Sequence, residues 1–286
     1  MSGTDAIHVL ALDIDGTLLN SNKEISTRNR SAIDAARAGG VRLALVTGRR
    51  YPAARKIADQ LGGDPALILH NGGLVVDAAK PIRVRPLKRD SAMKVVAFAK
   101  RLGADPVVHF GHRGEGLLYV ETASPSHTLL AYYLSRSHPD VRVVESLETA
   151  IAGEPEEPLE VMFGGAMGEM SALARAIEAQ SFEVSALRTV YPREDLSLID
   201  VVGPTVDKSE ALRFLCDRWG IAVQRVLAVG DNWNDRAMLQ MAGVGCVMGN
   251  ADPELRSLGL TLVPGNDEDG VANAIERFVL ARPRGE

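Results

Sequence analysis

The chain has 286 residues, of which 46% are hydrophobic and 24% are charged, and its formal net charge is −5 at pH 7. A chain of this length buries a sizeable core in one or two domains, and the composition is that of an ordinary globular protein. The acidic balance argues against a general nucleic-acid binder, which usually carries a basic excess, but local positive groups or a metal still permit an anionic substrate.

The two cysteines, Cys216 and Cys246, form no framework of paired residues, which favours a reducing compartment and an ordinary role as buried apolar side chains. No stretch is long and apolar enough to span a bilayer, and no basic segment followed by an apolar run opens the sequence. We therefore expect a cytoplasmic protein with no membrane or nucleic-acid partner. No pattern in the sequence indicates an oligomeric state.

Short apolar runs alternate with helical patterns in the first part of the chain. Residues 7–12, 41–46 and 66–69 are almost continuously apolar, which is typical of strands covered on both faces. A helical pattern covers residues 26–38, and a second helix begins near Pro52. This alternation predicts βαβ units and a parallel sheet.

The same alternation returns towards the end of the chain. We expect helices over residues 210–219, 234–241 and 271–280, and strands over residues 226–229, 244–247 and 260–263. The two ends of the chain, residues 1–84 and 197–286, are therefore predicted to form one α/β domain, a parallel sheet with helices on both faces.

Residues 85–196 have a different pattern. Long polar helices are expected over residues 91–102, 126–137 and 168–180, among short strands such as 117–120 and 159–163. An acidic loop with two prolines lies at residues 153–158. We interpret this segment as a separate α+β domain inserted into the first.

Two carboxylates, Asp13 and Asp15, follow the first apolar run, at the expected carboxyl edge of the sheet. Open α/β folds bind ligands at this edge, and two close carboxylates repel each other unless they share a cation or a proton. Mg²⁺ prefers such oxygen ligands, while one Asp can act as a nucleophile and the other can transfer a proton. The alternative is a solvated turn, but the buried strand before the pair and Gly16-Thr17 after it favour a functional site.

Three later segments carry weaker signals. Thr47 and Gly48 offer a hydroxyl and backbone N–H groups to a phosphate oxygen, although alone they are better explained as a strand-to-helix turn. Lys208 precedes a helix start, where an ammonium would add to the positive helix end, although a single lysine usually lies on the surface. Asp231 ends another strand and is a candidate third metal ligand. Asn234 and Asp235, which follow it, could support the metal or Lys208, or could simply start a helix.

In this order, the four segments resemble the motifs of the haloacid dehalogenase-like phosphatases. The four motifs are matched by residues 12–19, 46–49, 207–212 and 229–239. Segments of the Cof-type branch, subclass IIB with a large inserted cap, are matched by residues 71–73, 243–251 and 266–271. The resemblance is strong at both ends of the chain and covers the middle only by size and position.

The resemblance implies a Rossmann-like core with a cap inserted between the second and third motifs. It implies Asp13 as the nucleophile that forms an aspartyl-phosphate, and Asp15 as general acid and then base. Mg²⁺ would be held by Asp13, the backbone carbonyl of Asp15, and Asp231. The transferring phosphate would be held by Thr47, Gly48, Lys208 and Asn234, with Asp235 in support.

The implied activity is Mg²⁺-dependent hydrolysis of small phosphorylated metabolites, with sugar phosphates as the first guess and nucleotides or cofactor phosphates behind them. Asp15 argues against halide displacement, because dehalogenase members of the family lack this acid. The alternatives are a phosphomutase of the same superfamily and a non-catalytic binding protein of the same fold. Two departures from the motifs, Ser209 and the bulky Trp233, leave the functional atoms in place but can change the shape of the site.

The inserted domain is expected to recognise the leaving group, because the core motifs contact only the phosphate. Its candidate contacts are His109, His112, Arg113 and Tyr119. Each of these residues taken singly is better explained as an exposed loop residue.

Overall fold

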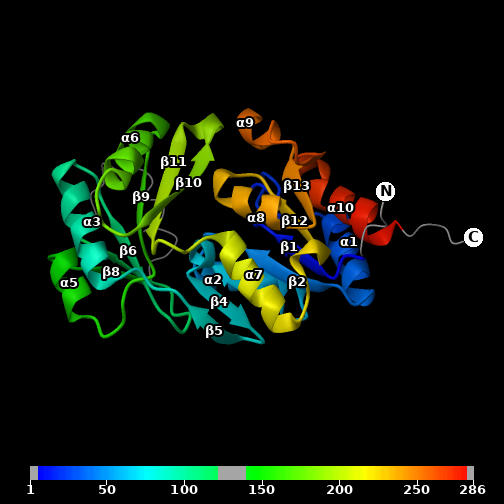
Figure 1. Ribbon diagram of the computed structural model, residues 1–286, viewed down its shortest axis with the longest axis horizontal. Helices are drawn as coiled ribbons and strands as arrows, with labels where there is room; N and C mark the ends of the chain where they lie inside the picture. Colours follow the sequence, from blue (N-terminus) through cyan, green and yellow to red (C-terminus); the bar gives the residue numbers. More distant parts are fainter. Residues whose placement is uncertain (1–5, 122–139, 282–286) are drawn as a thin grey trace, which may run out of the picture. The chain divides into compact units, whose positions relative to one another are not determined.

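The structure, a computed structural model, describes residues 6–121 and 140–281 (Figure 1). The chain forms two compact units. The first unit comprises Met1–Arg49, Ala53–Lys80 and Asp207–Glu286, and the second comprises Arg50–Pro52 and Pro81–Val206. The first and the last of the described residues therefore belong to the same unit.

An eight-stranded sheet forms the centre of the first unit, in the order β14-β13-β12-β1-β2-β3-β4-β5, although most of its edge strand β5 is counted with the second unit. Its strands are β1 (Val9–Leu12), β2 (Arg42–Val46), β3 (Ala66–Leu69), β4 (Leu74–Asp77), β5 (Lys80–Val84), β12 (Val226–Gly230), β13 (Val244–Met248) and β14 (Thr261–Val263). The strands from β14 to β3 are all parallel. The strand β4 runs antiparallel to β3, so the predicted parallel sheet ends in an edge that the sequence analysis did not anticipate.

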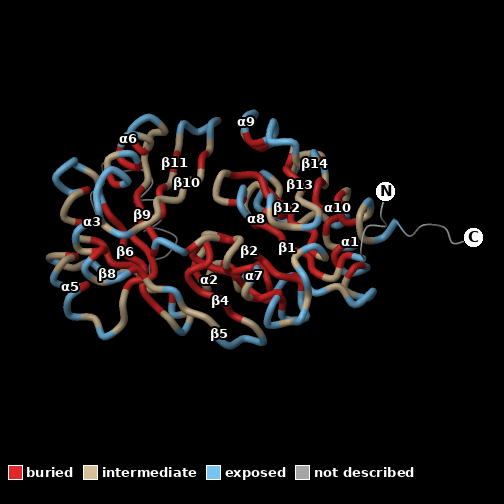
Figure 2. The backbone as a smooth tube through the Cα atoms, viewed as in Figure 1, coloured by how far each residue is buried: buried red, intermediate tan, exposed pale blue. Residues whose placement is uncertain are grey.

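Helices cover the sheet between its strands. They are α1 (Thr27–Ala38), α2 (Tyr51–Leu61), α7 (Lys208–Trp219), α8 (Arg236–Met241), α9 (Pro253–Arg256) and α10 (Gly270–Ile275), the last followed by a π-helical turn, η7 (Glu276–Leu280). Right-handed crossovers place α1 and α8 on opposite faces, because the chain leaves β1 and β12 in opposite directions along the sheet. The central strands β1 and β12 are buried along their whole length (Figure 2).

The helix α7 starts and stops where its sequence predicts. The side chain of Asp207 caps its first turn by accepting a hydrogen bond from the N–H of Glu210 at 2.8 Å. Gly220 ends the helix with φ +68°, a left-handed conformation that glycine adopts without steric cost. The first residue inside the helix is Lys208, so the cap fixes the backbone position from which the lysine side chain extends.

The direction of the chain reverses between β1 and β12. The chain continues from β1 to β2 and β3 on one side, whereas β12 leads to β13 and β14 on the other. Such a reversal opens a crevice at the carboxyl ends of the strands, where open α/β sheets bind their ligands. Asp13 and Asp231 are the residues that follow these two strands.

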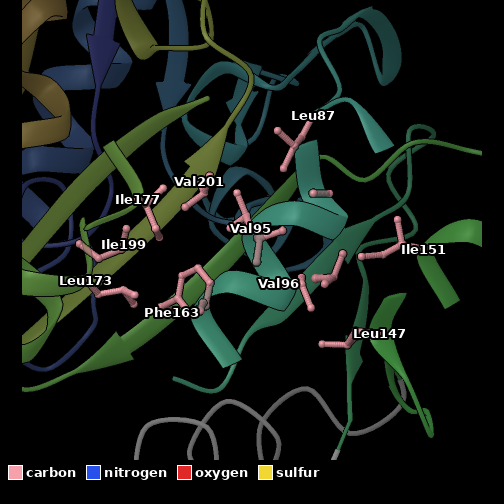
Figure 3. Packing of buried hydrophobic residues seen from close by; sticks show 14 of the residues in the cluster. Leu87, Val95, Val96, Leu147, Ile151, Phe163, Leu173, Ile177, Ile199 and Val201 are labelled. Atoms are coloured by element: carbon pink, nitrogen blue, oxygen red, sulfur yellow. The ribbon is translucent and has the colours of Figure 1, made fainter. Parts of the chain in front are cut away.

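A second sheet of six strands lies in the second unit, in the order β10-β11-β9-β6-β7-β8. Its strands are β6 (Val107–Phe110), β7 (Leu117–Val120), β8 (Val141–Val143), β9 (Glu160–Gly165), β10 (Ser185–Tyr191) and β11 (Leu196–Val202). The helices α3 (Arg89–Arg101), α5 (Leu147–Gly153) and α6 (Met167–Glu178) pack on one face, where Val95, Phe163 and Ile199 belong to one buried cluster (Figure 3).

The second unit extends further along the chain than the expected inserted domain, residues 85–196. The strand β11 pairs with β9 and β10, so the segment up to Val202 belongs to the second sheet and not to the core. The boundary differs because an apolar strand pattern does not say which sheet the strand joins. The helix expected over residues 126–137 lies outside the described residues.

Cys216 and Cys246 are both buried free thiols, and burial raises their pKa values to about 11 and about 12. Among the helices that the structure describes, none is long and apolar enough to cross a membrane.

Candidate active site

Lys208 lies between two buried carboxylates. Its Nζ donates to Oδ1 of Asp13 at 2.7 Å and to Oδ1 of Asp235 at 2.6 Å. The lysine side chain is 1% exposed, and the two carboxylate side chains are 8% and 0% exposed. This ammonium is therefore no surface group, and it joins the third motif to the first and the fourth.

Asp235 holds the loop that follows β12. Its Oδ2 accepts from the backbone N–H of Asp231 at 3.1 Å and from that of Asn232 at 3.0 Å, while its Oδ1 binds Lys208. Both oxygens of Asp235 are thus engaged in fixing its neighbours, and the carboxylate of Asp231 is presented by the loop.

Asp231 lies against the backbone of the loop after β1. Its Oδ1 accepts a hydrogen bond from Oγ1 of Thr17 at 3.0 Å. A Cβ added to Gly16 would lie 2.2 Å from Oδ2 of Asp231, and Gly16 has φ +75°. Only glycine allows the two loops to approach so closely. Thr17 stands in the first motif, but the sequence analysis assigned it no contact.

The charges of this cluster do not balance. Carboxylate oxygens of Asp13, Asp231 and Asp235 all lie within 4.8 Å of one another, around the single ammonium of Lys208. Burial raises the pKa of Asp13 to about 7, against the opposing effect of Lys208 and with a further rise from Asp235. Burial and the charge of Asp13 likewise raise the pKa of Asp231 well above its ordinary value.

A divalent cation would relieve this excess of negative charge. The hydrogen bonds described above occupy Oδ1 of Asp13 and Oδ1 of Asp231, so each carboxylate has a second oxygen to offer. Carboxylate and carbonyl oxygens in a buried, negatively charged pocket are the ligands that Mg²⁺ prefers. The residues present therefore fit a divalent metal ion.

The carboxylate of Asp15 is held by two cations. Arg49 binds it in a bidentate pair, with Nε 2.6 Å from Oδ2 and a terminal guanidinium nitrogen 2.7 Å from Oδ1, and Nζ of Lys23 lies 3.6 Å from Oδ1. Burial raises the pKa of Asp15, but the hydrogen bonds and charge of Arg49 outweigh it, and the pKa lies below its ordinary value. The second motif contains Arg49, yet its partner could not be inferred, because motif spacing does not show which side chains meet.

Thr47 and Gly48 follow β2 and meet a segment from after β3. Oγ1 of Thr47 accepts from the N–H of Arg49 at 3.1 Å, and its backbone carbonyl accepts from the N–H of Asn71 at 3.1 Å. Oδ1 of Asn71 accepts from Nδ2 of Asn234 at 2.9 Å, and a Cβ on Gly48 would lie 3.2 Å from Nδ2 of Asn71. Asn71 therefore connects the second motif with the fourth, a role that its sequence motif did not indicate.

Of the four residues expected to contact the leaving group, Tyr119 is in the wrong place. It is 3% exposed, its ring centroid lies 4.9 Å from that of Phe110, and its hydroxyl donates to Glu154. It belongs to the cluster beneath the helices of the second unit, because successive side chains on a strand point to opposite faces.

His109 is buried as well, whereas His112 and Arg113 are more accessible. His109 lies on β6 and is 1% exposed, with Nδ1 2.8 Å from Oε1 of the equally buried Glu160. His112 is half-buried, and its Nε2 lies 2.7 Å from the backbone carbonyl of Glu157. Arg113 is exposed.

Comparison with known proteins identifies the family. Residues 10–275 match the family model of haloacid dehalogenase-like hydrolases. The chain belongs to this family. It is therefore an enzyme with the fold of these hydrolases, and the four motifs that the resemblance rested on are those brought together at the carboxyl ends of β1, β2 and β12.

Several relatives span nearly the whole chain. The putative phosphatase YxeH of Bacillus subtilis is 28% identical over 96% of this chain and 99% of its own length. The pyridoxal phosphate phosphatase YbhA of Escherichia coli is 25% identical over 95% of this chain and 98% of its own. Among solved structures, BT1666 of Bacteroides thetaiotaomicron, described among phosphatases of this superfamily, is 25% identical with a TM-score of 0.79, covering 97% of both chains. These relatives support a phosphatase.

Proposed function

We propose that this hydrolase is a Mg²⁺-dependent phosphatase of small phosphorylated metabolites that forms an aspartyl-phosphate at Asp13. The observation that carries the proposal is the buried group formed by Asp13, Lys208 and Asp231 at the crevice of the sheet. A carboxylate nucleophile, fixed positive charge and a nearby proton carrier are what phosphoryl transfer from a monoester requires. The relatives named as phosphatases support the same reaction.

The metal site consists of Asp13, the backbone carbonyl of Asp15, and Asp231 in this proposal. Mg²⁺ supplies the positive charge that allows an anionic carboxylate to approach a phosphate dianion. Lys208 holds the Asp13 carboxylate in place through a hydrogen bond to Oδ1.

The phosphate is bound by the hydroxyl of Thr47, the N–H of Gly48 and the ammonium of Lys208, with Asn234 behind them. Asn234 acts through Asn71, whose amide lies against Gly48. These donors would stabilise the charge that spreads over the phosphoryl oxygens during transfer.

Asp15 carries the protons of both half-reactions. It donates a proton to the leaving oxygen when Asp13 attacks phosphorus, and it accepts one from the water that hydrolyses the phosphoenzyme. Its pairing with Arg49 favours the ionised carboxylate, which is the form the second step needs. The first step, in which the leaving oxygen receives a proton, requires the protonated carboxyl of Asp15.

The proposal is tested with two aspartate variants and two substrates. D13N removes the nucleophile, so neither phosphoenzyme nor orthophosphate should form. D15N removes the proton donor, so it should slow an alkyl phosphate more than an aryl phosphate, whose leaving group needs less protonation. Near-wild-type turnover by D13N, or full turnover in excess EDTA, would refute the mechanism.

The substrate class is approached by a screen for orthophosphate release. Sugar phosphates are the first group to test, followed by nucleotides and by cofactor phosphates such as pyridoxal phosphate and FMN. A phosphomutase would use the same two aspartates but return the phosphoryl group to its substrate. Orthophosphate release without a bisphosphate activator therefore favours the phosphatase.

We also propose that the second unit selects the leaving group. Arg113 is the exposed cation among the residues named for this role. R113A should lower kcat/KM for the best natural substrate and spare a small aryl phosphate, since the phosphate-binding residues are unchanged. Equal losses with both substrates would argue against selection by this residue.

A further inference from the structure

Two asparagines near the end of the chain hold the loop that carries Asp15. Asn250 lies just after β13, and Asn266 begins the turn η6 (Asn266–Glu268). Both stand in segments that resemble the Cof-type branch, residues 243–251 and 266–271, and neither takes part in the mechanism proposed above.

The two side chains form one hydrogen-bonded unit, which we call the asparagine pair. Nδ2 of Asn250 donates to the backbone carbonyl of Gly16 at 2.9 Å, and Nδ2 of Asn266 donates to that of Leu19 at 2.9 Å. Oδ1 of Asn250 accepts from the N–H of Asn266 at 3.0 Å, which links the two. The pair thus holds both ends of a four-residue segment whose first residue directly follows Asp15.

The bonded segment is a closed turn. Asp15 and Leu19 form an isolated bridge, and the N–H of Leu19 donates to the carbonyl of Ile14 at 2.9 Å. Gly16, with φ +75°, is the sharp corner of this turn. The Gly16 carbonyl is the next backbone carbonyl after that of Asp15, so a hydrogen bond to it restrains the backbone directly beside Asp15.

The hydrogen bonds of the asparagine pair are poorly suited to a purely stabilising role. Asn250 is exposed and Asn266 is half-buried, and hydrogen bonds open to water add little to the free energy of unfolding. A carboxamide donates through its nitrogen and accepts through its oxygen, and Asn250 uses both atoms here. An aspartate of the same shape would keep the acceptor, lose the donor, and place a negative charge against the Gly16 carbonyl.

We propose that the asparagine pair positions Asp15 for proton transfer to the leaving group. The inference rests on the phosphatase function proposed above. Arg49 fixes the carboxylate end of Asp15, and the asparagine pair fixes its backbone end. Loss of the Asn250 donor should therefore impair the step that depends on Asp15 and leave nucleophilic attack by Asp13 largely intact.

The test compares N250D with the wild type on an alkyl phosphate and on p-nitrophenyl phosphate, with Mg²⁺ saturating. A positioned general acid contributes about 10²–10⁴-fold, so N250D should lower kcat/KM for the alkyl ester by at least about 10-fold and for the aryl ester by less than about 3-fold. N266D, at the other end of the pair, should show the same selective loss. S21A is the matched control. Ser21 lies six positions beyond Asp15, and its hydroxyl donates to Oδ2 of Asp267 at 2.6 Å, so the variant removes a different hydrogen bond to the same segment. It should behave as the wild type with both esters.

A double mutant decides whether the pair acts through Asp15. In the D15N background, N250D should cause no further loss with the alkyl ester, since residues that act as a unit are non-additive. Equal losses with both esters, persistence of the N250D effect in D15N, or a raised Mg²⁺ requirement as the main defect would overturn the proposal. N250Q, which keeps the amide, should regain part of the alkyl activity, and its failure to do so alongside intact folding would count against the proposal. If the wild type released no phosphate from either ester, the proposed function itself would fail.

Discussion

Replacing Lys208 by Met gives the sharpest test of the buried charge cluster. The variant keeps most of the side-chain volume and removes the ammonium that binds Asp13 at 2.7 Å and Asp235 at 2.6 Å. The lysine side chain is 1% exposed, so water cannot replace it. Removing one partner of a buried ion pair costs about 3–5 kcal/mol, and we expect K208M to lose this much of its free energy of unfolding at pH 8 in EDTA.

The loss should depend on pH in a defined direction. Without the ammonium, the buried carboxylates keep their protons to higher pH, whereas the same groups in the unfolded chain release them near pH 4. The folded variant therefore binds more protons than the unfolded chain, and its stability rises as the pH falls. The difference between K208M and the wild type should accordingly be smaller at pH 5.5 than at pH 8.

Urea unfolding followed by tryptophan fluorescence measures the free energy of unfolding of the first unit, which contains Lys208. The chain has two tryptophans, Trp219 and Trp233, and both lie in the first unit. R28M is the matched control, because it also removes one cation of that unit, from an exposed pair with Glu276 whose side chains are 50% and 44% exposed. Such exposed pairs contribute little to stability, because water screens their charges. A loss below about 1 kcal/mol in K208M at pH 8, or a loss equal at both pH values, would refute the reasoning.

Three further predictions concern the same site. G16A should abolish Mg²⁺-supported activity, because its Cβ would lie 2.2 Å from a carboxylate oxygen of Asp231. The control G40A has φ +87° and open space around its Cβ, so it should retain activity at a cost of about 1 kcal/mol of stability. Initial rates measured against Mg²⁺ concentration compare the two variants. R49M removes the group that lowers the pKa of Asp15, so the limb of the kcat/KM profile that belongs to Asp15 should move to higher pH, and an unmoved limb would contradict the pairing. In EDTA the wild type should lose stability as the pH rises from about 4 to 7. Burial raises the pKa of Asp13 to about 7, so over this range the folded protein holds a proton that the unfolded chain has released. Thermal unfolding should accordingly show that Mg²⁺ stabilises the protein more at pH 7.5 than at pH 5.

The core of the fold could be predicted from local sequence alone. The strands expected over residues 7–12, 66–69 and 226–229 are present as β1, β3 and β12 with small changes at their ends. Nearly continuous apolar runs of this length have few alternatives to a strand buried on both faces. The strands β4 and β5 were missed: β4 has only four residues, and β5, the edge strand, is poorly buried and has a weaker apolar pattern.

The extent of the second unit could not be predicted in the same way. The pattern at residues 197–202 indicates a strand equally well in either sheet, and only its pairing with β9 and β10 assigns it to the second. Likewise, Tyr119 occupies a strand whose two faces the sequence does not label. Its burial beneath helices of the second unit follows from packing over long sequence separations.

At the site, the kinds of functional groups and their order along the chain could be predicted from the motifs. Each motif follows a strand or begins a helix, and parallel strands end at the same edge of a sheet, so the sequence predicts that Asp13, Thr47, Lys208 and Asp231 lie close together. The hydrogen-bond partners depend on the packing of the whole fold: Arg49 binds Asp15, Thr17 binds Asp231, and the asparagine pair binds the loop after β1. Local sequence encodes backbone conformation and burial through short-range periodicity, but a hydrogen bond between residues 234 positions apart depends on how whole strands and helices pack, which no local pattern records.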